Sequence, residues 1–147
     1  MACLTRREVP LCLDARSLAA GDLTYHQFKR LPTHFTLRAA TQVITNQCTR
    51  DEPGFINRIV LRELVWVLES AYGYPKDTIV AVLEKLLRTT QLKIEDAQSA
   101  WTAFRMYHKG KADYADCLLG ATNRIAGCDS TVTFDQAAIK LEGFQPL

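Results

Sequence analysis

The sequence predicts an α/β domain in which helices cover both faces of a central, mainly parallel sheet. Short apolar runs alternate along the chain with longer segments in which apolar residues recur at helical spacing, the pattern of strands joined by amphipathic helices. The chain has 147 residues, of which 48% are hydrophobic and 23% charged. This length and composition suit one domain, residues 1–147, with a buried core.

The chain divides into an atypical first segment, residues 1–38, and a clearly patterned second segment, residues 39–147. In the first segment the one strand-like run is Val9–Leu13, which ends at Asp14. Helical and strand periodicity becomes regular only after Ala39. We therefore expect the second segment to form most of the fold.

The second segment contains eight predicted elements, each with a recognisable boundary. Gly73 ends one helix, Pro75 begins the next, and Asp96 is a good N-cap for a third. In order, the elements are a helix near Ala40–Cys48, a strand at Phe55–Ile56, a helix at Ile59–Tyr72, a helix after Pro75, a strand at Leu92–Ile94, a helix after Asp96, a helix at Asp113–Ala126 and a strand at Thr131–Phe134.

The sequence argues against a membrane protein and a secreted protein. The formal net charge of +2 permits a nucleic-acid partner without arguing for one. The most apolar stretch, Ile59–Leu68, contains Arg62 and Glu63, so no membrane span is predicted. Charged residues arrive too early for a signal peptide, and we expect a cytoplasmic protein.

The cysteines and histidines form no metal-binding pattern. The five cysteines are scattered without a CxxC pair, which supports neither a zinc site nor a disulfide framework. We expect reduced thiols, buried or half-buried. The three histidines have no ligand spacing.

Five acidic side chains are placed where parallel sheets bind ligands, beyond the carboxyl ends of the strands. Asp14 and Asp135 each follow a predicted strand, and Glu63 lies in the first turns of the helix after Phe55–Ile56. Asp113 and Asp116 are three residues apart at a helix start, so they share one face. We expect these carboxylates to converge on one pocket.

Converging carboxylates repel one another, and their pKa values rise unless a cation neutralises them. Mg²⁺ takes oxygen ligands, with a few carboxylates supplemented by water and substrate phosphate. Such a cluster is suited to metal-assisted hydrolysis of a phosphodiester, which needs no His, Cys or Ser nucleophile.

Each acid also has an ordinary structural interpretation. Asp113 is a good N-cap, Glu63 beside Arg62 fits a solvated helix position, and Asp135 fits the start of a turn. Taken one at a time, these interpretations are at least as good as the functional one. Only the joint placement of the acids favours a site.

Residues 39–147 resemble VapC-family PIN-domain ribonuclease toxins in several separate motifs. The order, spacing and residue types of the motifs all agree with that family. The motifs are Pro53–Asn57, Leu61–Glu69, Tyr72–Gly73, Ala112–Leu118, Ala126–Cys128 and Val132–Asp135.

The resemblance implies a three-layer α/β/α domain acting as an endoribonuclease with Mg²⁺ or Mn²⁺. It further implies the toxin of a type II toxin-antitoxin system, with an RNA substrate, a cognate antitoxin and a homodimer. Glu63, Asp116 and Asp135 match the family's second, third and fourth acids, and Asp113 its accessory acid. Thr133 matches a small hydroxyl residue near the substrate.

The amino terminus departs from the family's pattern. The family's first strand ends in Leu-Asp-Thr, whose Asp is a metal ligand, whereas this chain has Leu13, Asp14 and Ala15, with the bulky Arg16 next. Pro10 also fits a central strand badly, because it cannot donate to the ladder. Asp14 is thus the candidate first acid. A shifted reading frame or displaced start over residues 1–38, and a diverged but working strand, both explain the departure.

Other functions remain open on these residues. A catalytically silent PIN-like module would keep the fold and bind an antitoxin or nucleic acid without cleaving it. A DNA nuclease would use the same acids. A phosphatase with an aspartyl nucleophile needs an Asp-x-Asp pair after the first strand, which Asp14, Ala15 and Arg16 do not supply.

Overall fold

The computed structural model describes residues 46–147. The predicted strand Val9–Leu13, with Asp14, lies outside these residues. Of the predicted helix near Ala40–Cys48, the description includes Asn46 and Gln47, which are helical, and Cys48, which follows the helix and is buried.

Every other predicted element is present, with small changes at the ends. The structure adds two short elements that the sequence pattern did not predict, the 3₁₀ helix η2 (Ala138–Lys140) and the strand β4 (Phe144–Pro146). The remaining elements are β1 (Gly54–Ile56), α3 (Arg58–Ser70), α4 (Lys76–Arg88), β2 (Leu92–Ile94), α5 (Ala97–Lys109), α6 (Tyr114–Ile125) and β3 (Thr131–Thr133).

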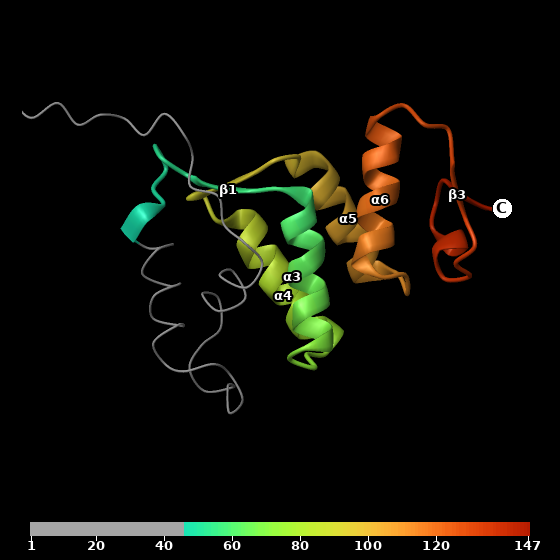
Figure 1. The fold of residues 1–147 in the computed structure, drawn as a ribbon, viewed down its shortest axis with the longest axis horizontal. Helices are drawn as coiled ribbons and strands as arrows, with labels where there is room; N and C mark the ends of the chain where they lie inside the picture. Colours follow the sequence, from blue (N-terminus) through green and yellow to red (C-terminus); the bar gives the residue numbers. More distant parts are fainter. Residues whose placement is uncertain (1–45) are drawn as a thin grey trace, which may run out of the picture.

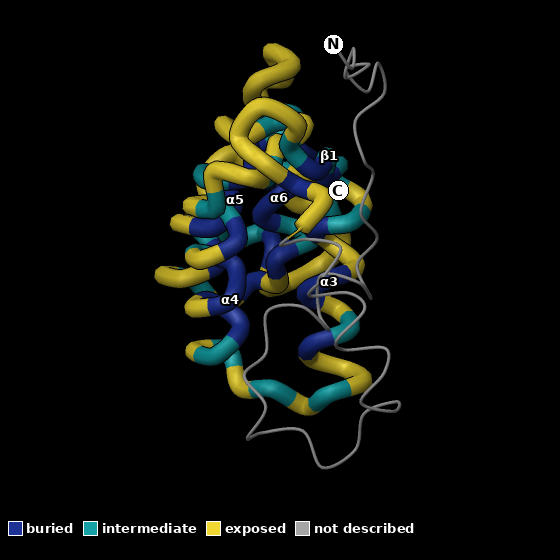
Figure 2. Tube along the Cα trace, turned by 90° about the vertical axis from the view of Figure 1, so that its left-hand side faces the viewer, coloured by how far each residue is buried: buried dark blue, intermediate teal, exposed yellow. Residues whose placement is uncertain are grey.

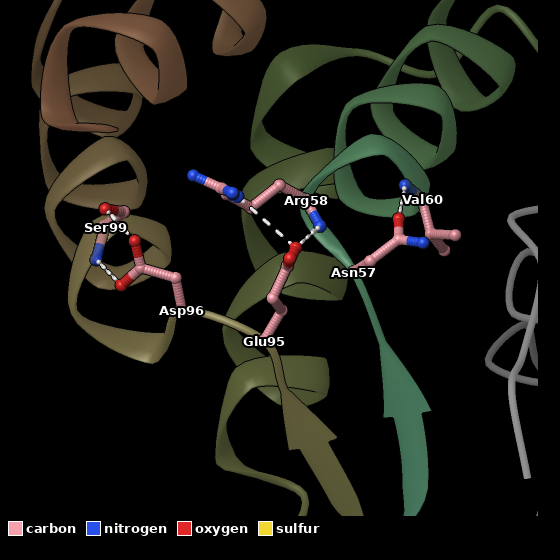
Figure 3. Close-up of polar contacts among 6 residues, drawn as sticks. All are labelled: Asn57, Arg58, Val60, Glu95, Asp96 and Ser99. Carbon is pink, nitrogen blue, oxygen red and sulfur yellow. Dashed lines mark hydrogen bonds and ion pairs between the residues drawn. The ribbon is translucent and has the colours of Figure 1, made fainter. Parts of the chain in front are cut away.

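Capping residues fix the starts of α3 and α5. Asn57 directly follows β1, and Asp96 lies two residues after the end of β2. The Asn57 side chain accepts from the Val60 amide at 2.9 Å, and Asp96 accepts from the Ser99 amide at 3.0 Å (Figure 3). Capping satisfies amides that have no partner inside the helix. The expectation that Asp96 caps its helix is therefore confirmed.

An ion pair joins the ends of β1 and β2. Glu95 accepts from the Arg58 backbone amide at 3.0 Å and from the Arg58 side chain at 3.3 Å (Figure 3). The two strands are parallel, with Gly54 opposite Leu92 and Ile56 opposite Ile94. The contact between Arg58 and Glu95 thus links the chain just after β1 to the chain just after β2.

The α/β fold class and the parallel strand pairing are confirmed. Within residues 46–147 the strands form two separate parallel pairs, β1–β2 and β3–β4. These pairs lie on opposite sides of α5 and α6 (Figure 1). Neither pair is joined by a further strand among the described residues.

The core lies between the four helices. Each of them turns its apolar side inward, while the outer sides of α4 and α5 are exposed (Figure 2). Fully buried side chains come from α3, α4 and α6, among them Leu64, Leu83 and Cys117. No helix in the described part of the chain is long and apolar enough to span a membrane.

The thiols differ in exposure. Cys48 and Cys117 are buried, as expected, whereas Cys128 is exposed, contrary to the expectation of burial. Cys128 lies just after Gly127 beyond the end of α6, where a short loop leaves the core. Cys3 and Cys12 lie outside the described residues.

Gly120 lets the β3–β4 pair pack on α6. The ring of Phe144, the first residue of β4, is buried against this glycine. A Cβ at position 120 would lie 2.9 Å from Cζ of Phe144 and still closer to Cε2. The close approach therefore requires a residue without a side chain.

We expect Gly120→Ala to destabilise the protein. Overpacking a core costs about 1–3 kcal/mol, which exceeds the gain of about 1 kcal/mol that Ala brings to a helix interior. Urea denaturation measures the difference. In a Phe144→Ala background the same substitution should stabilise the protein, because the ring is gone. Equal effects in both backgrounds would contradict the packing argument.

Candidate functional site

Asp113 and Asp116 are held together at the start of α6. Asp113 is the N-cap residue, and its Oδ1 accepts from the Asp116 amide at 2.7 Å. The sequence favours this because Asp caps well and an acid in the first turn interacts favourably with the helix dipole. Both expectations for Asp113, as an N-cap and as a neighbour of Asp116, are therefore met by one geometry.

Asp135 is fixed by the turn that follows β3. Its Oδ1 accepts from the amides of Ala137 at 2.6 Å and Ala138 at 3.0 Å, which begins η2. The Thr133 hydroxyl accepts from the Asp135 amide at 3.1 Å. Thr133 thus positions Asp135, while Phe134 between them is 79% exposed. The strand ends one residue earlier than the pattern predicted.

The three carboxylates are close enough to influence one another. Partial burial raises the pKa of Asp116 to about 6, and the charges of Asp113 and Asp135 add to that rise, as does a hydrogen bond with the Asp113 side chain. Repulsion of this kind is expected where carboxylates share a site. Asp113 and Asp135 therefore lie near enough to Asp116 for their charges to raise its pKa.

The other two predicted acids do not join this cluster in the described structure. Glu63 is exposed on α3, its side chain makes no hydrogen bond to the described residues, and it is not among the charges that raise the pKa of Asp116. The helices α3 and α6 do pack against each other. Asp14 lies outside residues 46–147.

The donor chemistry of this cluster suits a hard divalent cation. Asp113, Asp116 and Asp135 supply oxygen ligands, and a cation would relieve the repulsion that raises the pKa of Asp116. Within residues 46–147, however, no three His, Cys, Asp or Glu side chains are already arranged as a metal-binding group. The described residues therefore do not by themselves form a metal-binding group.

The buried Cys117 lies one residue after Asp116, and its position excludes a thiolate. Burial raises the pKa of the Cys117 thiol to about 12, and the neighbouring carboxylates contribute to the rise. A thiol with such a pKa stays protonated at neutral pH and is a poor nucleophile. Cys117 therefore belongs to the core.

Sequence reasoning missed a polar network behind the carboxylates. The Lys76 ammonium donates to the Gly110 carbonyl at 2.6 Å, and the Tyr107 hydroxyl donates to Glu69 at 2.9 Å. No local pattern signals these contacts, because they join residues 34 and 38 positions apart. Their place in the fold is at the connection between α5 and α6.

A cavity of about 330 Å³ lies away from the acids. It is at the opposite end of β3 from Asp135 and contains none of the predicted site residues. Its lining comes from the end of α6 and the starts of β3 and β4, including Arg124, Thr131 and Glu142. Arg124 is already engaged there, donating to the Glu142 carbonyl at 3.1 Å. The cavity is thus separate from the carboxylate site.

Comparison with known proteins gives a consistent result. Residues 31–143 match the model of the PIN domain family. A VapC ribonuclease of Aquifex aeolicus (strain VF5) is 28% identical over 96 residues, which are 65% of this chain and 70% of that protein. No solved structure matches the chain.

We expect Asp116→Asn to stabilise the metal-free protein above about pH 6. The pKa of Asp116 is higher in the folded state than its ordinary value of 3.8, so folding is disfavoured once this carboxyl ionises. Stability contributed by this group is lost as pH rises from about 4 to 6. The gain of the variant should therefore disappear as pH falls through that window, as melting temperatures in EDTA would record.

Asp77→Asn is the matched control for this measurement. Asp77 is also an acid in the first turn of a helix, α4, but is exposed. Its loss removes a favourable interaction with the helix dipole and should lower the melting temperature slightly at neutral pH. If both variants changed stability in the same direction, repulsion at Asp116 would not be the cause.

Proposed function

Because the chain belongs to the PIN domain family, we propose that it is a metal-dependent endoribonuclease, the toxin of a type II toxin-antitoxin system. The bond between the Asp113 side chain and the Asp116 amide, together with the raised pKa of Asp116 to which burial and the charges of Asp113 and Asp135 contribute, is the observation that carries the proposal. The similarity to a protein named VapC ribonuclease supports the ribonuclease activity.

In this proposal Asp116, Asp135 and Asp113 hold Mg²⁺ or Mn²⁺, and Glu63 and Asp14 complete the site. When bound, the cation activates a water molecule and stabilises negative charge on the phosphate. The chain's own acids bind and orient the cation. The hydrogen bonds from backbone amides to the Asp113 and Asp135 carboxylates support this role. A carboxylate that is already oriented by such bonds loses little conformational freedom when it binds a cation.

Glu63 is the least supported of the described acids. It lies in the second turn of α3, a helix that packs against α6. Its exposed carboxylate has no hydrogen-bond partner among the described residues, so it is free to turn towards a cation held by Asp116. We assign it the role of orienting the attacking water.

The proposed partners are an RNA substrate, a cognate antitoxin and a second copy of the chain, and the proposed location is the cytoplasm. Ile59 and Trp66 are large apolar side chains that are exposed seven residues apart on one side of α3, and this apolar surface supports a protein partner.

The second candidate is a catalytically silent PIN-like module. One observation favours it, namely that the described residues contain no complete metal-binding group. Such a module would keep the fold and bind an antitoxin or nucleic acid. Metal-stimulated cleavage by the purified protein distinguishes the two functions.

We expect Asp116→Asn to reduce RNA cleavage by about 100-fold or more while the protein remains folded, because a positioned charged group is lost. Mn²⁺ should raise the melting temperature of the native protein, because a cation present at 100 times its Kd adds about 2.7 kcal/mol to the free energy of unfolding. The variant should lose this response. Asp77→Asn, on the exposed face of α4, is the control and should keep both properties.

Glu63→Gln extends the same experiment to α3. A ligand or water-orienting role predicts lost cleavage with retained folding. A melting temperature that Mn²⁺ does not move in the native protein would instead favour the silent module. Cleavage by Asp116→Asn at the native rate would overturn the assignment of the acids.

A further pair of variants tests the role of Asp14. If Val9–Leu13 is a working first strand, Asp14→Ala should be as damaging to cleavage as Asp116→Asn. If residues 1–38 are a displaced or misread segment, Asp14→Ala should change little. Replacing residues 1–16 with a strand ending in Leu-Asp-Thr-Asn should then raise cleavage by orders of magnitude. The two outcomes exclude each other.

A further inference from the structure

The acids at the start of α6 depend on a very short connection. The helix α5 ends at Lys109, Gly110 is its C-cap, and Asp113 is already the N-cap of α6. Ala112 within the connection is buried. A small displacement of this connection therefore moves Asp113, and with it the amide of Asp116 that Asp113 binds.

One side chain from another helix holds this connection. Lys76, the first residue of α4, donates its ammonium to the Gly110 carbonyl at 2.6 Å. This carbonyl lies at the C-terminal end of α5, where carbonyls lack helical partners and the helix dipole favours a cation. The contact therefore satisfies α5 and fixes the first residue of the connection.

The Lys76 ammonium is itself held in place. It lies 4.4 Å from the centroid of the Tyr107 ring. That ring is 2% exposed, donates its hydroxyl to Glu69 of α3 at 2.9 Å, and packs edge-on against Tyr114 at 5.8 Å. Lys76 is thus held against an aromatic pair whose second member, Tyr114, is the first residue of α6.

We propose that Lys76 is a positioning residue that anchors the Gly110 carbonyl and thereby sets Asp113 and Asp116 for cation binding. Lys76 does not touch the cation or the substrate. The inference rests on the proposed function only in taking these carboxylates as the cation site. It gives α4 a role in positioning the acids of α6, through Lys76.

The first test uses the metal-free protein. Lys76→Met keeps the aliphatic stem but removes the ammonium, so the hydrogen exchange of the Asp116 amide should become at least tenfold faster by NMR. Lys76→Arg should restore slow exchange, because Arg keeps a charged donor. Lys109→Met is the matched control, since it removes an equal charge one residue from Gly110 and should leave the exchange rate unchanged.

The second test is Mn²⁺ binding, followed by the EPR signal of the free ion. Lys76→Met should weaken binding at least fivefold, whereas Lys76→Arg and Lys109→Met should bind like the native protein. In cleavage assays at saturating Mn²⁺, kcat should fall more than KM changes. If Lys76→Met fails to fold, Lys76→Gln serves in both tests with the same expected result.

The outcomes separate this inference from the proposed function. Unchanged exchange and unchanged Mn²⁺ affinity in the neutral Lys76 variants would overturn the positioning role. Equal weakening by Lys109→Met would also overturn it, because charge alone would then explain the effect. A native protein that binds no Mn²⁺ would refute the proposed cation site, while the exchange result would still decide whether Lys76 anchors α6.

Discussion

The packing of α5 against α6 is the interaction on which the described structure depends. Small buried residues, such as Ala100, Ala103 and Ala121, let the helices approach closely, and the aromatic pair Tyr107 and Tyr114 joins their connected ends. Both other helices pack on this hairpin, and β4 packs on its outer side through Phe144. A change in the hairpin would therefore reach the core and the acids together.

The acids at the start of α6 lower the stability of the apo fold locally. Asp113 contributes through its cap and Asp116 through the helix dipole, but their mutual repulsion, with Asp135, opposes ionisation of Asp116. Repulsion of this size persists only where the backbone is held firmly. The hydrogen bonds that Asp113 and Asp135 accept from backbone amides supply that constraint.

Local signals in the sequence predicted the helices and strands well, because each boundary depends on neighbouring residues. Asp96 and Asp113 cap their helices as expected, and the pairing of Asp113 with Asp116 follows from helix geometry alone. The rule that strand ends share an edge predicted Asp135 near these acids, and the charge of Asp135 does contribute to the raised pKa of Asp116. Membership of the PIN domain family, first indicated by short motifs, covers residues 31–143.

Tertiary structure alone decided the features that join distant residues. The strand β4 has a weak local pattern with a proline, and it exists because β3 supplies a partner. Gly120 matters only because Phe144 reaches it, and Lys76 only because Gly110 lies beside it. The place of Glu63 relative to the start of α6 likewise depends on how α3 packs on α6. A sequence encodes caps and periodicity within a few residues, whereas these contacts arise only when the core brings separate elements together.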